Sequence, residues 1–222
     1  MEGSSFIWMC WLLWVWSTFF LEKSNKRFYL ATISLLLIAL IPVEIELFSV
    51  KLNMAIIFIF ILLCYLMRTI RLLKLLYMLG ISICIAMACI SFQLFSLYDP
   101  VVLFIDIRYY LSAFSILLAA FVFGRFSHKL STCIMGIVIG EFFWGITSYT
   151  FFSVGQIGRL FIFDVVFYSA LFLLSLYGFK QCALFINRIL TLWLKSRHWI
   201  EEERFSNTQS AKSTIKGQVA KG

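Results

Sequence analysis

Seven long apolar runs follow one another along the chain, and short charged segments separate them. A helix needs about 20 mainly apolar residues to cross the hydrocarbon core of a bilayer. Only 14% of the 222 residues are charged and 62% are hydrophobic, whereas a soluble domain carries about 25% charged residues. Too few polar side chains remain to cover a soluble surface, so the sequence excludes a soluble globular protein.

We therefore predict an all-α, polytopic transmembrane helix bundle over residues 1–179, with about seven spans. No basic residue precedes the first run, so it lacks the n-region of a cleavable signal peptide and is expected to remain as a membrane helix. Six spans, with one hydrophobic segment misjudged, are the alternative. The expected spans lie near 5–21, 28–43, 52–67, 75–94, 101–123, 130–152 and 161–179.

The basic residues predict the orientation of these spans. Of the 19 Lys and Arg residues, 16 follow the first, third, fifth and seventh runs, and the other three are Lys51, Arg108 and Arg159. Cytoplasmic loops carry an excess of Lys and Arg. We expect a multi-pass protein of the cell membrane with its N-terminus outside and its C-terminus in the cytoplasm.

Beyond the seventh run the chain becomes more polar. In residues 180–200, polar residues recur with apolar residues between them in an amphipathic helical pattern. This predicts a helix along the inner leaflet with Arg188, Lys195 and Arg197 toward anionic headgroups. The alternative is a cytoplasmic extension of the seventh helix. Residues 201–222 have little to bury and are expected to be a disordered cytoplasmic tail. This C-terminal segment can also meet a cytoplasmic protein partner.

Glu141 lies 11 positions from either end of the sixth run, near the expected bilayer midplane. A carboxylate there is costly and should face the bundle interior. It is either a proton-carrying or cation-binding group, or a structural acid that hydrogen-bonds a neighbouring helix. Gly136, Gly140 and Gly145 on the same helix predict close helix packing around it.

A second set of polar residues lies toward the outer ends of the last three runs. If the fifth and sixth helices are neighbours, Arg108 can pair with Glu141 and keep it ionised. The outer halves of the fourth to seventh helices can then line an outward-facing polar pocket, with Gln93 and Tyr110 nearby. Alternatively, each polar residue snorkels to water by itself. The candidate pocket comprises Glu141, Arg108, Asp106, Asp164, Arg159 and Tyr109.

Motifs for common catalytic and cofactor chemistry are missing from the sequence. There is no Gly-x-Ser-x-Gly elbow, His-Glu-x-x-His helix or phosphate-binding glycine loop. The two histidines, His128 and His198, are far apart and have no carboxylate or cysteine at metal-ligand spacing. We expect no catalytic residue, no metal, no cofactor and no nucleic-acid partner.

The N-terminal segment carries a family resemblance. It combines Met1-Glu2-Gly3, tryptophans at 8, 11 and 14, the run Thr18-Phe19-Phe20 and the basic loop 23–27. This combination resembles the start of the YphA-type membrane proteins of Bacillus-like bacteria, which have a similar length and multi-pass layout. The resemblance implies a bacterial cytoplasmic membrane location, but no activity and no residue roles.

Three functions remain in view. The first is a non-enzymatic role in interaction or assembly, which requires no specific arrangement of reactive residues. The second is a small-solute or ion transport component that uses the pocket around Arg108, Glu141 and Asp164. The third is an intramembrane enzyme, for which catalytic groups would have to converge in one cavity. Helix adjacency decides among them.

Overall fold

Helices form 82% of the computed structural model. The structure describes residues 2–47, 50–98, 105–122, 125–152 and 155–219, without the side chains of 47, 152, 192 and 194–219. The chain divides into two units, unit 1 up to Leu174 and unit 2 from Ser175 onward.

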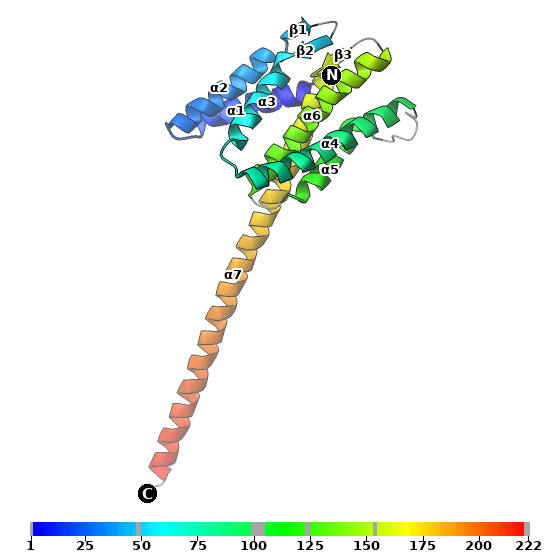
Figure 1. Ribbon diagram of the computed structural model, residues 1–222. Coiled ribbons are helices and arrows are strands. Elements are labelled where there is room, and N and C mark those ends of the chain that lie inside the picture. Colours follow the sequence, from blue (N-terminus) through cyan, green and yellow to red (C-terminus); the bar gives the residue numbers. More distant parts are fainter. Residues whose placement is uncertain (1, 48–49, 99–104, 123–124, 153–154, 220–222) are drawn as a thin grey trace. The chain divides into compact units, whose positions relative to one another are not determined.

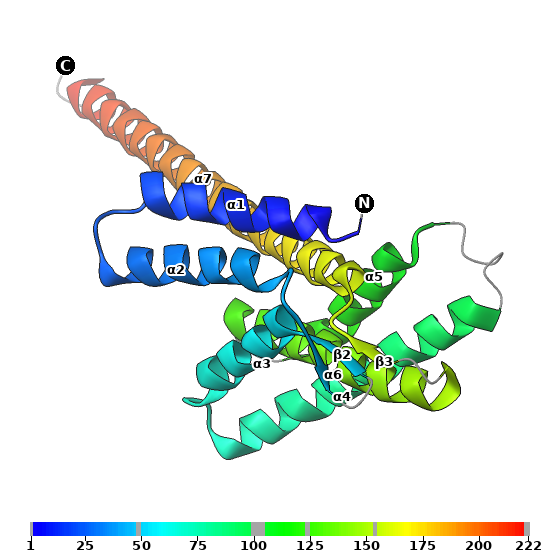
Figure 2. The ribbon, with the colours of Figure 1, turned by 90° about the horizontal axis from the view of Figure 1, so that it is seen from above.

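Within the described ranges there are seven helices and three short strands (Figure 1). The helices are α1 (Ser4–Phe19), α2 (Asn25–Leu40), α3 (Met54–Met67), α4 (Leu72–Tyr98), α5 (Ile107–Ala120), α6 (Phe126–Phe152) and α7 (Leu160–Val219). In unit 1, α1 and α2 lie side by side as a hairpin, and α4 packs against both α5 and α6 (Figures 1 and 2). The fifth and sixth expected helices are neighbours, which the pairing of Arg108 with Glu141 required, since α5 also contacts α6.

Several helices have the length and composition of membrane spans. Three are long and apolar enough to cross a bilayer: Leu72–Tyr98, Phe126–Phe151 and Leu160–Thr191. The apolar helices Ser4–Phe19, Met54–Met67 and Ile107–Ala120 are shorter. At a rise of 1.5 Å per residue, the 14 residues of α3 extend about 21 Å, which is less than the roughly 30 Å of a typical hydrocarbon core.

A three-stranded sheet corrects the expectation of an all-helical fold. Strands β1 (Glu44–Leu47) and β2 (Val50–Asn53) form an antiparallel pair in which Leu47 is opposite Val50. Strand β3 (Gly155–Ile157) pairs with β2 in parallel, Val50 opposite Gly155. The segment 44–47 alternates Glu, Ile, Glu and Leu, a period of two that is typical of a strand. The sheet connects the segment before α3 to the segment before α7.

Asn53 joins this sheet to the helices. Its side-chain Oδ1 accepts a hydrogen bond from the Ala55 backbone N–H at 2.9 Å and so caps α3. Its Nδ2 donates to the Ile41 carbonyl at 2.8 Å, at the end of α2. Asn53 is 2% exposed, so both ends of its amide are satisfied inside the protein. One buried side chain therefore fixes the end of α2, the end of β2 and the start of α3.

Helices α4 and α6 pack closely against each other in the core of unit 1. A Cβ added at Gly136 would lie 2.6 Å from the Cβ of Ile85 and 2.9 Å from the carbonyl oxygen of Ser82. One turn later, a Cβ at Gly140 would lie 3.3 Å from the Cα of Ala86. The hydroxyl of Ser82 also donates to the Thr132 carbonyl at 3.1 Å. The glycines on this side of α6 thus let the backbones of α4 and α6 approach closely, as small-residue motifs do in membranes.

Gly136→Ala is expected to destabilise unit 1 by about 1–3 kcal/mol, because the added methyl group overpacks the α4 contact. Gly80→Ala is the matched control, since nothing lies within 4 Å of a Cβ at that position. Alanine in a helix interior is favoured over glycine by roughly 0.5–1 kcal/mol, so the control should be neutral or stabilising. The midpoints of thermal unfolding in mild detergent are measured for the two variants and for the unaltered protein. Equal midpoints for the two variants would contradict the close approach.

Unit 2 consists of the part of α7 from Ser175 to Val219. It includes residues 180–200, for which we expect an amphipathic helix, and residues 201–219 of the segment 201–222, for which we expect a disordered tail; residues 220–222 lie outside the described residues. The structure has helix across both segments. The domain boundaries at 179 and 200 stay predictions.

Candidate functional site

Glu141 is fully buried, and Arg159 is its hydrogen-bond donor among the described residues. Its Oε1 accepts from the Arg159 backbone N–H at 3.2 Å and from Nε at 3.1 Å. Its Oε2 accepts from Nη2 of the same guanidinium at 3.1 Å. Two parallel charge-assisted bonds of this kind are among the strongest in proteins. The carboxylate at mid-helix of α6 is thus neutralised within unit 1.

Polar and aromatic side chains surround the Arg159 guanidinium. Nη2 of Arg159 also donates to Oε1 of Gln93 on α4. The ring centroid of Trp144 lies 4.8 Å from the guanidinium carbon and that of Phe161 lies 5.6 Å from it, a distance at which a ring face attracts a cation. Gln93 is buried, and its Nε2 has no hydrogen-bond partner among the described groups.

The chain reaches Arg159 through β3 and a glycine. Gly158 has φ +84°, which side chains other than glycine rarely adopt, and a Cβ there would lie 2.6 Å from that of Asn53. The turn directs the Arg159 N–H toward α6 just before α7 begins. Glu141 therefore lies at the N-terminal end of α7, where the helix dipole also favours negative charge.

Asp164 forms a second buried ion pair, with Arg108. It is fully buried on α7, and its Oδ2 lies 2.7 Å from Nη1 of Arg108 at the start of α5. The carboxylate also accepts from the backbone N–H of Gly3 at 2.8 Å and of Phe6 at 3.3 Å. Both donors are at the N-terminus of α1. Asp164 therefore caps α1 from another helix and neutralises Arg108.

Two further carboxylates lie close to Arg108. Nε of Arg108 is 3.5 Å from Oδ1 of Asp106, and Nη2 is 3.9 Å from Oε1 of Glu2. Asp106 also caps α5, because its Oδ1 accepts from the Arg108 backbone N–H at 3.0 Å. The Arg108 side chain is 18% exposed, whereas Glu2 is largely exposed and Asp106 is about half exposed. Arg108 thus connects a buried acid to two surface acids.

The structure corrects the predicted pairing of Arg108 with Glu141. Arg108 pairs with Asp164, and Glu141 pairs with Arg159. The physical reason is that Arg159 enters from the loop before α7 beside Glu141, while Asp164, one turn into α7, reaches Arg108. The two pairs remain close, since both guanidinium carbons lie within 6 Å of the centroid of the Phe161 ring.

The other candidate residues lie around these pairs. Tyr109 is about half exposed, and its ring centroid lies 5.0 Å from that of Tyr168 on α7. The Tyr168 hydroxyl is 3.1 Å from the hydroxyl of Ser5. The sequence analysis missed Tyr168, although it follows Asp164 by four residues and so shares its helix face. Gly145 contributes packing, because a Cβ there would overlap the side chain of Ile157 in β3.

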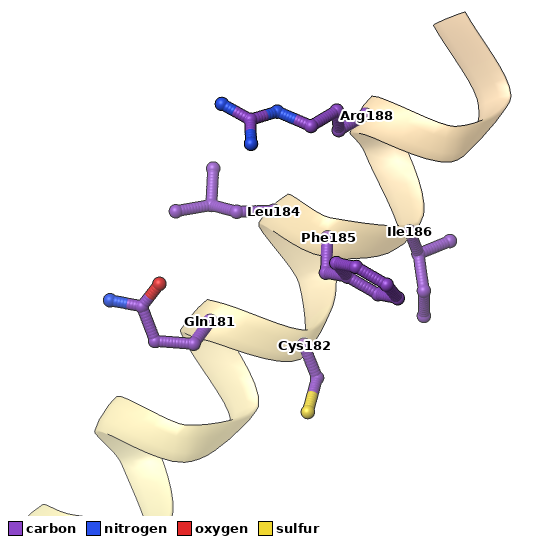
Figure 3. A pocket seen from close by; sticks show the side chains of 6 residues that line it. All are labelled: Gln181, Cys182, Leu184, Phe185, Ile186 and Arg188. Carbon is purple, nitrogen blue, oxygen red and sulfur yellow. The ribbon is translucent and has the colours of Figure 1, made fainter. Parts of the chain in front are cut away.

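The basic residues of unit 2 come later in the sequence than the residues of these ion pairs. Arg188 is exposed and borders a shallow hollow formed by one helix alone (Figure 3). Gln181, Leu184 and Arg188 extend toward one side of the helix in this view, and Cys182 toward another. Lys195 and Arg197 belong to α7, but their side chains lie outside the described part of the structure.

The described residues bring no three His, Cys, Asp or Glu side chains together as a metal site would require. The candidate residues mainly form hydrogen bonds with one another and with neighbouring groups of the protein. Such pairs fix helix positions. Among the described buried side chains, Nε2 of Gln93 and Nε of Arg108 have no hydrogen-bond partner, although Nε of Arg108 lies 3.5 Å from Oδ1 of Asp106.

The chain was compared with known proteins. The model of a family described as YphA-like integral membrane protein matches residues 2–199, which confirms the resemblance seen at the N-terminus. No curated protein and no solved structure matches the chain.

Proposed function

Since the chain belongs to the YphA-like integral membrane protein family, we propose that it is a non-enzymatic protein of the cell membrane with a role in interaction or assembly. The observation that carries the proposal is the state of the two buried carboxylates. Each has both oxygens engaged by donors of the protein and an arginine as counterion. A group held in this way stabilises a fold and is poorly placed to exchange protons or attack a substrate.

The proposed topology has seven spans, with the N-terminus outside and the C-terminus in the cytoplasm. The 16-to-3 distribution of Lys and Arg supports this orientation. The seven described helices each overlap one of the apolar runs. The shorter helices can be accommodated by local thinning of the bilayer, at a modest free-energy cost.

The proposed interacting part is the C-terminal segment. Arg188, Lys195 and Arg197 would contact anionic headgroups of the inner leaflet, each worth about 1 kcal/mol near a charged surface. On the same helix, the apolar side chains of Leu184 and Ile189 are 54% and 51% exposed. A helix with this much exposed apolar surface is suited to bind a cytoplasmic protein or the membrane interface.

Photo-cross-linking in native membranes tests this role. A photoreactive amino acid is placed in the full-length protein at Leu184 or Ile189, and at Leu36 or Leu76 in unit 1 as exposed controls. We expect a protein adduct of one defined mass from the two unit 2 positions and only lipid adducts from the controls. The same pattern at all four positions, or no protein adduct at Leu184 and Ile189, would contradict an interaction role.

A second candidate function is a small-solute or ion transport component with an outward-facing polar pocket around Arg108, Glu141 and Asp164. One observation favours it: the unpartnered Nε2 of Gln93 offers a buried donor next to the Arg159 guanidinium. Transport requires Glu141→Gln to abolish proton uptake in proteoliposomes without loss of folded protein. In the interaction role, this variant leaves the cross-linking pattern of unit 2 unchanged.

A further inference from the structure

Unit 1 contains an apolar cavity that none of the candidate polar residues lines. It has a volume of about 450 Å³ and lies between the α1–α2 hairpin and helices α3, α6 and α7. The start of α1 is held against α7, where the ring centroids of Phe6 and Phe163 are 5.3 Å apart. Farther along α1, Leu13 also lines the cavity and is 41% exposed. The hairpin is therefore pinned at one end, and the cavity lies along the rest of its length.

The lining of the cavity favours hydrocarbon over water. Its polar side chains are Ser34 and Ser131, and the Ser34 hydroxyl already donates to the Ala31 carbonyl at 3.0 Å. A buried water needs two to four polar partners, which this lining does not supply. Leu66 and Leu171, which also line the cavity, are 54% and 53% exposed, so the cavity is open at the surface of unit 1.

Cations cluster at one end of the cavity. On α2, Lys26 and Arg27 precede the lining residue Leu30 by one turn and share its helix face. Arg68 directly follows α3, two residues after the lining residue Leu66, and Arg125 directly precedes the lining residue Phe126 of α6. Within the described residues, none of these four cations has a carboxylate partner.

The acid nearest to this rim in sequence is Glu22, which is exposed in the segment between α1 and α2. The end of the cavity therefore keeps an excess of positive charge. An apolar slot with a basic rim at the membrane surface matches the two parts of an anionic phospholipid, the acyl chain and the phosphate. Along α6 the cavity extends from Phe126 to Ile134, a span of nine residues and roughly 12 Å, long enough for part of one acyl chain.

We infer that unit 1 binds one anionic phospholipid, with an acyl chain in this cavity and its phosphate at Lys26 and Arg27. The inference goes beyond the proposed function, because it needs only that the bundle lies in a bilayer and involves no partner of unit 2. The bound lipid fills a space that would otherwise leave the lining without van der Waals partners.

Native mass spectrometry of the full-length protein in mild detergent tests the inference. Dioleoyl phosphatidylglycerol is titrated into delipidated protein, and dioleoyl phosphatidylcholine serves as the zwitterionic comparison. We expect one phosphatidylglycerol bound in preference to phosphatidylcholine. The double variant K26Q/R27Q should weaken phosphatidylglycerol binding roughly 30-fold, since each cation near the surface contributes about fivefold, and should remove the preference.

The control is K51Q, which removes an exposed cation of β2 that precedes α3 and so lies at the opposite end of this helix from Arg68. It should leave binding unchanged. Ala170→Phe, and the smaller change Ser34→Leu if the first fails to fold, fill the cavity and should reduce binding of both lipids. Equal loss in the two charge variants, equal binding of the two lipids by the unaltered protein, or unchanged binding after filling the cavity would each overturn the inference.

Discussion

Replacing Asp164 with alanine is expected to lower the free energy of unfolding of unit 1 by about 3–5 kcal/mol. The substitution leaves Arg108, whose side chain is 18% exposed, without its closest counterion at 2.7 Å. It also removes the acceptor for the N–H groups of Gly3 and Phe6 at the start of α1, and the loss of an N-cap alone costs about 1 kcal/mol. A denaturant titration of the detergent-solubilised protein measures the change.

Two controls separate the buried ion pair from a general effect of charge. Asp164→Asn retains an oxygen for the α1 N–H groups. Its free energy of unfolding should lie between that of the alanine variant and that of the unaltered protein. Glu46→Gln removes a carboxylate that lies 3.4 Å from Lys51 but is 71% exposed, and exposed pairs are worth about 1 kcal/mol or less. If Asp164→Ala costs no more than Glu46→Gln, Asp164 does not hold α1 and α5 as the structure has it.

Replacing Arg159 with methionine is expected to destabilise unit 1 by a similar amount, about 3–5 kcal/mol. Glu141 is fully buried and would lose both side-chain bonds to its counterion. The double variant E141Q/R159M should recover part of this loss, because it leaves no unpaired charge inside the bundle. The same denaturant titration measures each variant, and a double variant less stable than R159M would contradict this account.

Double-mutant cycles distinguish the observed pairing from the one predicted from sequence. We expect coupling energies of about 0.5–3 kcal/mol for Glu141 with Arg159 and for Asp164 with Arg108. The crossed pair of Glu141 with Arg108 should couple more weakly, because neither is a direct partner of the other. A larger coupling for the crossed pair would restore the original hypothesis.

The helices could be predicted because an apolar run of this length lies in hydrocarbon and not in water. A backbone in hydrocarbon must satisfy its own hydrogen bonds, so a long apolar run forms a helix whatever its neighbours are. The run 130–152, for example, falls within the helix Phe126–Phe152. The cost of burying Glu141 likewise predicted that it faces inward, and it is fully buried.

The sheet and the ion-pair partners were harder to predict for two different reasons. The strands at 44–47, 50–53 and 155–157 are three or four residues long, and the parallel pairing of two of them joins residues more than 100 positions apart. The partner of an arginine depends on how neighbouring helices are rotated and at what depth they cross. The spacing of residues along one helix gives neither the rotation of the neighbouring helices nor the depth at which they cross.

The sequence by itself determined that this is a helical membrane protein of a particular family and that its inner charges need partners. Length, hydropathy and the cost of a buried charge depend on composition and on position along one chain segment. Only the tertiary structure decided that Arg159 neutralises Glu141 and that Asp164 both caps α1 and holds Arg108. Those contacts join four helices and a loop, and each depends on side chains brought together only when the helices pack.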